Sequence, residues 1–427
     1  MNPRRTFFKK SLAVAGALSL ASAAQSARAE SISDALLTLK NMSPVKAAQD
    51  EDVWERIAQS FTASPTYLNL NNAGASPQPV QVQDALERYN RISNELPTFY
   101  MTKTLEGGKE ELRRKLATLA GVSADEIAIV RNTTEALGIL TYGLTLQRED
   151  EIVMCRQDYP NMVHAWTQRS VRDGITISWV NLSLPFEDDD SVVKQYLSAT
   201  NRKTKVWHIT HMINWNGQIM PVKKLCAEAR KRNIATIVDG AQSFAQMEFT
   251  LRDLDPDYFG ASLHKWLCAP FGTGLLHVKK SNIKDLWPLF PNHEPQADDI
   301  RKFESFGTKS VPSEHAIGQA IAFHHAMGAK HKEERLRYLK NYWCERLVQN
   351  PRIKLNISQK PEFSCGVGHF SIDGLEPGRI ALRLKSEHEI HSVPSQTDGL
   401  SGVRISPHVY TLPRDLDRFC DAVVKLI

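Results

Sequence analysis

From about residue 79 the chain alternates helix-type sequence with short apolar, β-branched segments, and this alternation restricts the fold more than any other feature. Strands that are joined by helices run parallel, and a parallel sheet needs helices over both of its faces. The alternation therefore predicts an α/β fold with a mostly parallel sheet. The predicted strands are 126–130, 151–154, 176–180, 205–209 and 234–238, and 108–119 is a predicted helix.

Beyond this region the pattern changes. Residues 272–278 predict an antiparallel strand, and a long helix is expected to start near Ser313. Segments 366–372 and 403–406 have the character of strands in a smaller domain, which the amphipathic tail 414–427 closes as a packing helix. We expect an export signal over 1–29, an N-terminal segment over 30–75 that packs on the small domain, a large domain over 76–310, and a small C-terminal domain over 311–427.

The first 29 residues have the composition of an export signal. They contain five basic residues and no acidic one, followed by an apolar run over 12–24 and a small-residue cleavage pattern at 27–29. Paired Arg4 and Arg5, before a spaced Phe8 and Lys9, resemble the twin-arginine pattern. The alternative is a single membrane anchor, but the run is shorter than the ~20 residues that a span needs. We expect the twin-arginine translocation machinery to export the folded chain to the periplasm.

Charge and cysteine content exclude several classes of function. The five positive charges of the signal equal the formal net charge of +5, so the remaining chain is near neutral and we expect no nucleic-acid partner. The six cysteines include no CxxC pair, so neither a metal site nor a small disulfide scaffold is expected. An oxidising periplasm permits a disulfide, but the spacing favours no particular pair.

Asp239 and Lys265 together predict a cofactor site. Asp239 follows the β-branched run 234–238, at the end of a predicted strand, where open α/β sheets bind ligands. Lys265 lies 26 residues further on, within SLHKW at 262–266. Pyridoxal phosphate needs an amine for covalent attachment and a carboxylate beside its pyridine nitrogen. A lone lysine is most often a surface residue, whereas this combination predicts a pyridoxal-phosphate site.

These residues and further motifs in the same order resemble the class V aminotransferase family, pyridoxal-phosphate enzymes of fold type I, and especially its isopenicillin N epimerase-like branch. The resemblance extends from about Tyr67 to the C-terminus. It implies a mostly parallel large domain, a smaller C-terminal α/β domain, pyridoxal 5'-phosphate as cofactor, and a homodimer. It also implies that Lys265 and Asp239 are catalytic, Lys265 as general acid and base and Asp239 at the ring nitrogen.

The resemblance implies further cofactor contacts. Thr133 and Thr134 open a helix after a strand, where free N–H groups and the helix dipole bind phosphate, although a simple capping box is the alternative interpretation. Tyr159 would stack on the ring, and Thr308 would reach the phosphate from the partner subunit. The other implied contacts are Asn214 and Gln242 at the phenolic oxygen, and Ser262 and His264 at the phosphate.

Two residues are predicted to contact the substrate. Arg404 lies in VRISPHVY at 403–410, which resembles the family's strand whose arginine binds the substrate carboxylate. A guanidinium fork suits a carboxylate better than a lysine does. Asn72 lies in NNAG at 71–74, which resembles the loop at the substrate entrance. Taken alone, an arginine in a strand is more often part of a surface ion pair.

The cysteine positions lead to one exclusion. The family pattern implies that cysteine desulfurases carry a nucleophilic cysteine roughly 15 residues before the carboxylate arginine. Between Cys365 and Cys420 the chain has none, and Glu389 stands near that place. We therefore expect a pyridoxal-phosphate enzyme that is not a cysteine desulfurase.

The expected export signal and the family resemblance together indicate that the substrate is a small peptide or an amino acid. The chain resembles periplasmic enzymes that mature pyoverdine-type peptide siderophores. This implies action on the free amino group of the glutamyl side chain of a siderophore precursor, and its conversion to succinamide by oxidative decarboxylation. Two alternatives remain open: a periplasmic aminotransferase or epimerase of free amino acids, and a catalytically inactive pyridoxal-phosphate-binding protein. The intact set of Asp239, Lys265 and Arg404 argues against an inactive protein.

Overall fold

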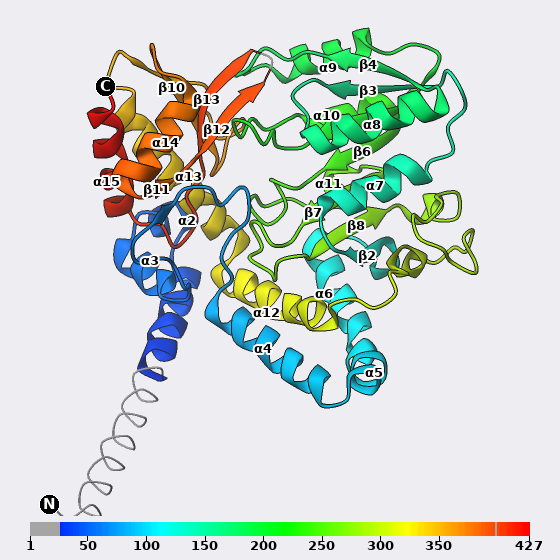
Figure 1. Cartoon of the computed structure of the whole chain (residues 1–427), viewed down its shortest axis with the longest axis horizontal. Coiled ribbons are helices and arrows are strands. Elements are labelled where there is room, and N and C mark those ends of the chain that lie inside the picture. The colour runs from blue at the N-terminus through cyan, green and yellow to red at the C-terminus, as the bar shows by residue number, and fades with distance from the viewer. Residues whose placement is uncertain (1–25, 398) are drawn as a thin grey trace, which may run out of the picture.

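The computed structural model describes residues 26–427 apart from residue 398, and its largest sheet has the order β2-β8-β7-β6-β5-β3-β4 (Figure 1). Adjacent strands are parallel except that β8 runs antiparallel to both β2 and β7. The predicted mostly parallel sheet and the antiparallel strand near 272–278 are confirmed. The strands are β2 (Ile127–Val130), β3 (Glu151–Cys155), β4 (Thr176–Val180), β5 (Thr204–Thr210), β6 (Ala235–Asp239), β7 (Tyr258–Ser262) and β8 (Gly274–Val278).

Both faces of this sheet are buried under helices. Successive side chains of a strand point to opposite faces, and in β2 Ile127 and Ile129 join one apolar core while Ala128 and Val130 join another. Helices α7 (Thr133–Gly143) and α8 (Pro160–Asp173) cover the second core. The first core is covered by α4 (Val80–Glu95), α6 (Lys109–Ala120), α9 (Asp189–Ser198), α10 (Val222–Arg230) and α12 (Val311–Met327), and two short helices, α5 (Pro97–Phe99) and α11 (Leu251–Leu254), complete the domain.

A second, smaller sheet of order β12-β13-β10-β9 forms the C-terminal domain, at the upper left of Figure 1. All its strand pairs are antiparallel. Its apolar core lies between the sheet and three helices. The elements are β9 (Ile353–Leu355), β10 (Gly368–Ile372), β12 (Val393–Thr397), β13 (Leu400–Ile405), α13 (Ala329–Leu347), α14 (Pro377–His388) and α15 (Pro413–Lys425).

The N-terminal segment is attached to this small domain. Helix α2 (Pro44–Ala47) packs on α13, α3 (Glu51–Ala58) follows it, and β1 (Leu68–Asn69) pairs in parallel with β11 (Ile390–His391). The predicted start of the small domain at 311 is too early. Helix α12 packs against α4 and α6, and four of its apolar side chains belong to a core of the large domain. Helix α13 is the first helix after it that contributes to the core of the small domain.

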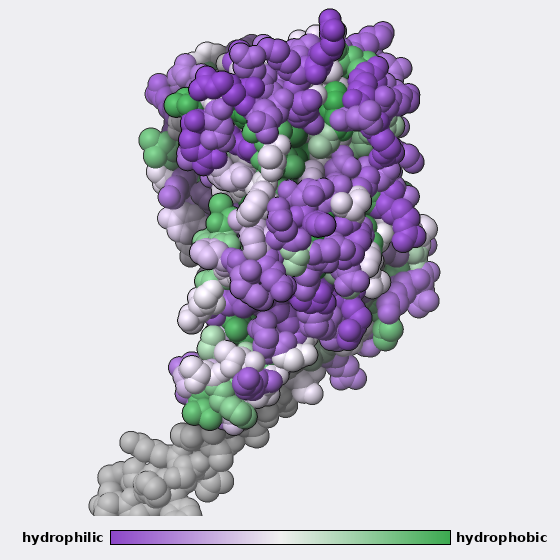
Figure 2. Space-filling view, turned by 90° about the vertical axis from the view of Figure 1, so that its right-hand side faces the viewer, coloured by the Kyte–Doolittle hydropathy of each residue, from purple (hydrophilic) through white to green (hydrophobic). Residues whose placement is uncertain are grey.

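The predicted export signal falls on 1–29, and residues 1–25 lie outside the described part of the chain. Over the residues that are described, no helix combines the length and the apolar character that crossing a membrane requires. Figure 2 shows a mostly hydrophilic face with small, separate apolar areas.

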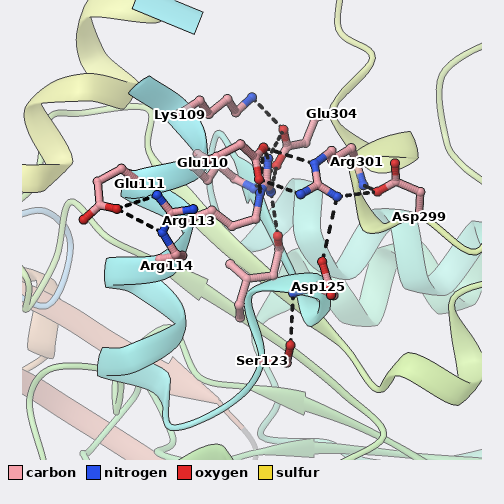
Figure 3. A network of polar contacts seen from close by, with 12 residues as sticks. Lys109, Glu110, Glu111, Arg113, Arg114, Ser123, Asp125, Asp299, Arg301 and Glu304 are labelled. Carbon is pink, nitrogen blue, oxygen red and sulfur yellow. Dashed lines mark hydrogen bonds and ion pairs between the residues drawn. The ribbon is translucent and has the colours of Figure 1, made fainter. Parts of the chain in front are cut away.

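A buried network of charges ties α6 to the edge of the large sheet (Figure 3). Glu304 ends the 3-10 helix η5 (Ile300–Glu304), and its carboxylate accepts from Arg113 Nη1 (2.5 Å), Lys109 Nζ (2.6 Å) and the backbone N–H of Ile129 (2.6 Å). Burial alone would raise the pKa of Glu304, but Arg113 and Lys109 hold that pKa below its ordinary value. The network therefore stabilises the fold above that ordinary value and loses this contribution as the pH falls through the lowered pKa.

Replacing Glu304 by glutamine should destabilise the protein by about 3–5 kcal/mol, because it leaves Lys109 and Arg113 buried without a full counter-charge. Urea denaturation followed by circular dichroism measures the loss. Glu111→Gln, on the helix that carries Lys109 and Arg113, is the control, since Glu111 and its partner Arg114 are more than half exposed and their pair contributes about 0–1 kcal/mol. Equal midpoints for the two variants would contradict this account of the network.

Candidate active site

A cavity of about 310 Å³ opens at the carboxyl ends of β5, β6 and β7, the edge at which parallel α/β sheets bind ligands. Its walls come from both domains and from segments far apart in the sequence. The structure therefore brings most of the predicted site residues together. Those that line the cavity are Thr133, Thr134, Tyr159, Asn214, Asp239, Gln242, Ser262, His264, Lys265 and Arg404.

Asp239 and Lys265 face the cavity from neighbouring segments. Asp239 is the last residue of β6, and its Oδ1 accepts the N–H of Ala241 at 2.8 Å, which fixes the carboxylate. Burial raises the pKa of Asp239, while this hydrogen bond and the charge of Lys265 oppose the rise. Burial also lowers the pKa of Lys265 to about 8, with Asp239 acting against the shift and Arg404 adding to it. The amine therefore becomes neutral as the pH rises through about 8, well below the ordinary lysine range.

The start of α7 and the end of β7 form a polar cradle. The Thr133 N–H donates to Ser262 Oγ at 2.9 Å, and the two hydroxyl oxygens lie 2.8 Å apart. Asn132 caps the helix by accepting the N–H of Glu135. A Cβ at Gly274 would lie 2.7 Å from the Asn132 backbone, so only glycine lets β8 approach the helix start this closely. Free N–H groups at such a helix start favour a phosphate.

His264 and Gln242 are held by buried partners. His264 Nδ1 lies 3.1 Å from the carbonyl oxygen of Thr273, which places the proton on Nδ1 and leaves Nε2 for another contact. Gln242 Nε2 donates to the carbonyl oxygen of Ala73 at 2.9 Å, and Gln242 Oε1 accepts from Trp266 Nε1 at 3.0 Å. One hydrogen of the Gln242 amide nitrogen remains for a ligand, as the predicted contact with a phenolic oxygen requires.

Arg404 is a buried cation on β13. Its Nη1 donates to the carbonyl oxygen of Asn214 at 2.9 Å, and its Nη2 donates to Asn71 Oδ1 at 2.7 Å. No carboxylate of the described residues pairs with it, and its Nε is buried without a partner there. Burial lowers the pKa of Arg404 to about 10. An unneutralised guanidinium at the cavity wall is suited to an anionic ligand group.

The structure does not place Asn72 in the cavity wall. Asn72 Nδ2 donates to the carbonyl oxygen of Ser406 at 2.9 Å, and its Oδ1 accepts from Tyr410 Oη at 2.7 Å. Its side chain therefore joins the N-terminal loop to the small domain, which corrects the predicted substrate contact. Sequence reasoning missed the neighbouring Asn71, which contacts Arg404.

Thr308 lies in an exposed turn between η5 and α12, away from the cavity of its own chain. Buried or nearly buried ion pairs anchor both ends of this turn. Glu304 joins the network of α6 before it, and Lys309 pairs with Glu314 at 3.1 Å after it. The contact of Thr308 with a partner subunit's phosphate, and the homodimer itself, stay predictions.

Sequence reasoning also missed Thr210, the last residue of β5, whose side chain lines the cavity beside Asp239. A threonine at a strand end carries no pattern of its own. The alignment of predicted strand ends could have indicated Thr210, since adjacent parallel strands end at the same edge of the sheet.

The site fits pyridoxal phosphate on the chemistry of its donors. The cavity offers a lysine amine, a buried carboxylate, a helix start for a phosphate, and the exposed ring of Tyr159. The side-chain oxygen position of Asn214 is buried without a partner among the described residues, as expected for an amide that completes its contacts with a ligand. When bound, this cofactor supplies an electron sink for bonds at the amine-bearing carbon of a substrate.

The fold and the site define a pyridoxal-phosphate enzyme of fold type I. The family model for class-V aminotransferases matches residues 68–419, and the chain belongs to this family. It is 26% identical over 393 residues to isopenicillin N epimerase of Streptomyces clavuligerus, which covers 87% of this chain and 98% of that protein. The family membership and the fit of the site identify pyridoxal phosphate as the cofactor.

Cysteine desulfurases are also among the relatives. The chain is 27% identical over 397 residues to a probable cysteine desulfurase of Halalkalibacterium halodurans, covering 86% of this chain and 94% of that protein. The solved structure of the cysteine desulfurase CsdA from Escherichia coli matches with a TM-score of 0.77 at 19% identity, over 87% of this chain and 98% of that one. The prediction that this enzyme is not a cysteine desulfurase is therefore wrong. The missing cysteine near Glu389 does not separate the chain from these relatives.

Attachment of pyridoxal phosphate to the apo-protein should become faster as the pH rises through about 8, because Lys265 reacts as the neutral amine. Stopped-flow absorbance of the visible cofactor band measures this rate. Arg404→Gln should move the midpoint upward, since it removes a like charge that lowers the pKa of Lys265. Lys265→Ala, which should give no covalent band at any pH, is the control. A midpoint near the ordinary lysine value of 10.5 would refute the predicted pH dependence.

Proposed function

We propose that this chain is an enzyme that acts on a primary amine whose carbon also carries, or lies close to, a carboxylate. The observation that supports this most directly is Arg404, a buried guanidinium without a counter-charge among the described residues, on the wall of the cavity that contains Lys265. A carboxylate at Arg404 would satisfy the free Nε and neutralise the charge. The substrate amine would then lie toward Lys265.

Each residue of the site has a role in this proposal. With the cofactor bound, Asp239 would hold a proton at its ring nitrogen, and Lys265, whose pKa is lowered by burial, would accept and return a proton near the reacting carbon. Thr133 and Ser262 would hold the phosphate. Tyr159, which is 39% exposed, covers one side of the cavity and restricts the access of water.

We further propose that the substrate is the free glutamyl amine of a pyoverdine-type siderophore precursor, and that the product is the succinamide formed by oxidative decarboxylation in the periplasm. The support lies in the sequence: the twin-arginine pattern at residues 4 and 5, and the resemblance to periplasmic siderophore-maturing enzymes. In this reaction Arg404 binds the carboxylate that is lost, and the nitrogen stays with the product. The overall conversion needs an oxidant, which dioxygen can supply.

Relatives give two other substrate classes for this site. Isopenicillin N epimerase of Streptomyces clavuligerus favours an epimerase or aminotransferase of free amino acids, and the desulfurase of Halalkalibacterium halodurans favours L-cysteine. All three substrate classes share a carboxylate beside an amine. A substrate panel therefore distinguishes them at one common site.

The deciding experiment incubates the purified mature holoenzyme with a deacylated siderophore precursor, common amino acids or L-cysteine, with and without dioxygen. Mass spectrometry and sulfide release record the products. Succinamide formation that requires Lys265 and an oxidant supports the siderophore proposal. Turnover of amino acids or L-cysteine alone would reject it in favour of the corresponding alternative, and a visible cofactor band without any turnover would favour an inactive pyridoxal-phosphate-binding protein.

Arg404→Lys should raise KM for the carboxylate substrate by about 10- to 100-fold, because an ammonium keeps the charge but loses the bidentate fork. The affinity for pyridoxal phosphate should change little. Steady-state kinetics and a cofactor titration separate the two effects. Arg346→Lys, at an exposed ion pair on α13, is the matched control. An unchanged KM would remove Arg404 from substrate binding.

A further inference from the structure

A second buried carboxyl group lies beneath the cavity. Asp158, which is 2% exposed, stands in the turn between β3 and α8. Its Oδ2 accepts the N–H of Cys155 at 2.9 Å, and its Oδ1 accepts from Thr210 Oγ1 at 2.6 Å. Both oxygens are thereby fixed, one by the end of β3 and the other by the end of β5.

Thr210 links this carboxyl to the cofactor site. It lines the cavity, and in the sheet register it is the direct partner of Asp239 on the adjacent parallel strand. The backbone continues the link, since the N–H of His211 donates to the carbonyl oxygen of Asp239 at 2.9 Å. Asp158 and Asp239 therefore lie on either side of one threonine, at the edge where the ring of the cofactor is expected.

Asp158 also fixes the backbone position of Tyr159. Tyr159 is the next residue and the N-cap of α8, and it contributes its ring to the cavity wall. The N–H of Asp158 donates to the carbonyl oxygen of Cys155 at 3.2 Å, in addition to the contacts of its side chain. Two side-chain contacts and one backbone contact therefore fix Asp158 immediately before Tyr159, and they restrict the backbone from which the tyrosine ring projects.

The carboxyl of Asp158 is not neutralised by any cation of the described residues. Within residues 26–427 apart from 398, no lysine, arginine or histidine forms an ion pair with it, and the titratable groups whose charges act with it are Asp239, Cys155 and Tyr196. Burial raises the pKa of Asp158 to about 7; hydrogen bonds from Thr210 and Cys155 oppose the rise, and the charge of Asp239 adds to it. Above this pH Asp158 adds a negative charge beneath the cavity.

We propose that Asp158 is a positioning residue of the active site, which orients Thr210 and Tyr159 and places a second negative charge beside Asp239, so that cationic forms of the bound cofactor are favoured. This inference rests on the proposed use of pyridoxal phosphate at Lys265. It is independent of which amine is the substrate, because none of these contacts involves Arg404. The physical reason is that a nearby negative charge stabilises a protonated group over its neutral form.

The test is a pH titration of the visible absorbance of the bound cofactor in the holoenzyme. Asp158→Asn keeps the shape and removes the charge, so the midpoint of the titration should move down by about 0.5–1 pH unit, while cofactor affinity stays within about threefold. Asp190→Asn, an exposed carboxylate on α9, is the control and should leave the midpoint unchanged. An unchanged midpoint in Asp158→Asn would overturn the inference.

A second pair of variants covers the case in which Asp158→Asn does not fold. Thr210→Val removes the hydroxyl that lowers the pKa of Asp158, so less negative charge is present at a given pH and the midpoint should again move down. Thr210→Ser keeps the hydroxyl and should restore the midpoint, which a purely structural role of Thr210 does not predict. If wild type shows no visible band, the proposed cofactor function fails; a normal band with midpoints unaffected by these variants overturns this inference alone.

Discussion

The pairing of three parallel strands, β5, β6 and β7, is the constraint on which the active site depends. Because these strands end at one edge of the sheet, Thr210 and Asp239 stand side by side and the segment that carries Lys265 follows directly from β7. Gly240 completes the arrangement, since a Cβ there would lie 1.9 Å from the ring of Phe259 on β7. The chain can therefore pass over Phe259 only if residue 240 has no side chain, and this close passage keeps Asp239 at the cavity.

Charges are used in two different ways in this protein. In the network of Figure 3, buried Glu304 is matched by Lys109 and Arg113, so the charges stabilise the fold. Around the cavity, Arg404 and Asp158 are buried without a counter-charge among the described residues, and burial shifts their pKa values. Unneutralised buried charge costs stability, which a bound ligand can offset. The paired charges therefore stabilise the fold, whereas the unpaired charges of Arg404 and Asp158 act on the ligand site, Arg404 from the cavity wall and Asp158 from beneath it.

The sequence patterns predicted much of this arrangement. Strand ends, helix starts and the order of motifs identified Asp239, Lys265 and the α7 cradle, because backbone periodicity and local capping depend on neighbouring residues. The domain boundary near 311 was misplaced, since the apolar pattern of α12 does not reveal which core it joins. Asn71 and Asn72 are adjacent and chemically identical, and only their contacts distinguish them. The exclusion of desulfurase chemistry failed because one missing cysteine does not define a branch of the family.

The sequence by itself determined the α/β fold, the family, and the lysine and carboxylate of the cofactor site. These features depend on strand periodicity and motif chemistry, which involve residues close together in the sequence. Only the tertiary structure decided which side chains reach the cavity and which charges lack partners. Asp158 and Thr210, which share a hydrogen bond, are 52 residues apart in the sequence, and Arg404 donates to Asn71 from 333 residues away. Such contacts arise from sheet register and domain packing, and these depend on the burial of the whole chain rather than on any segment of it.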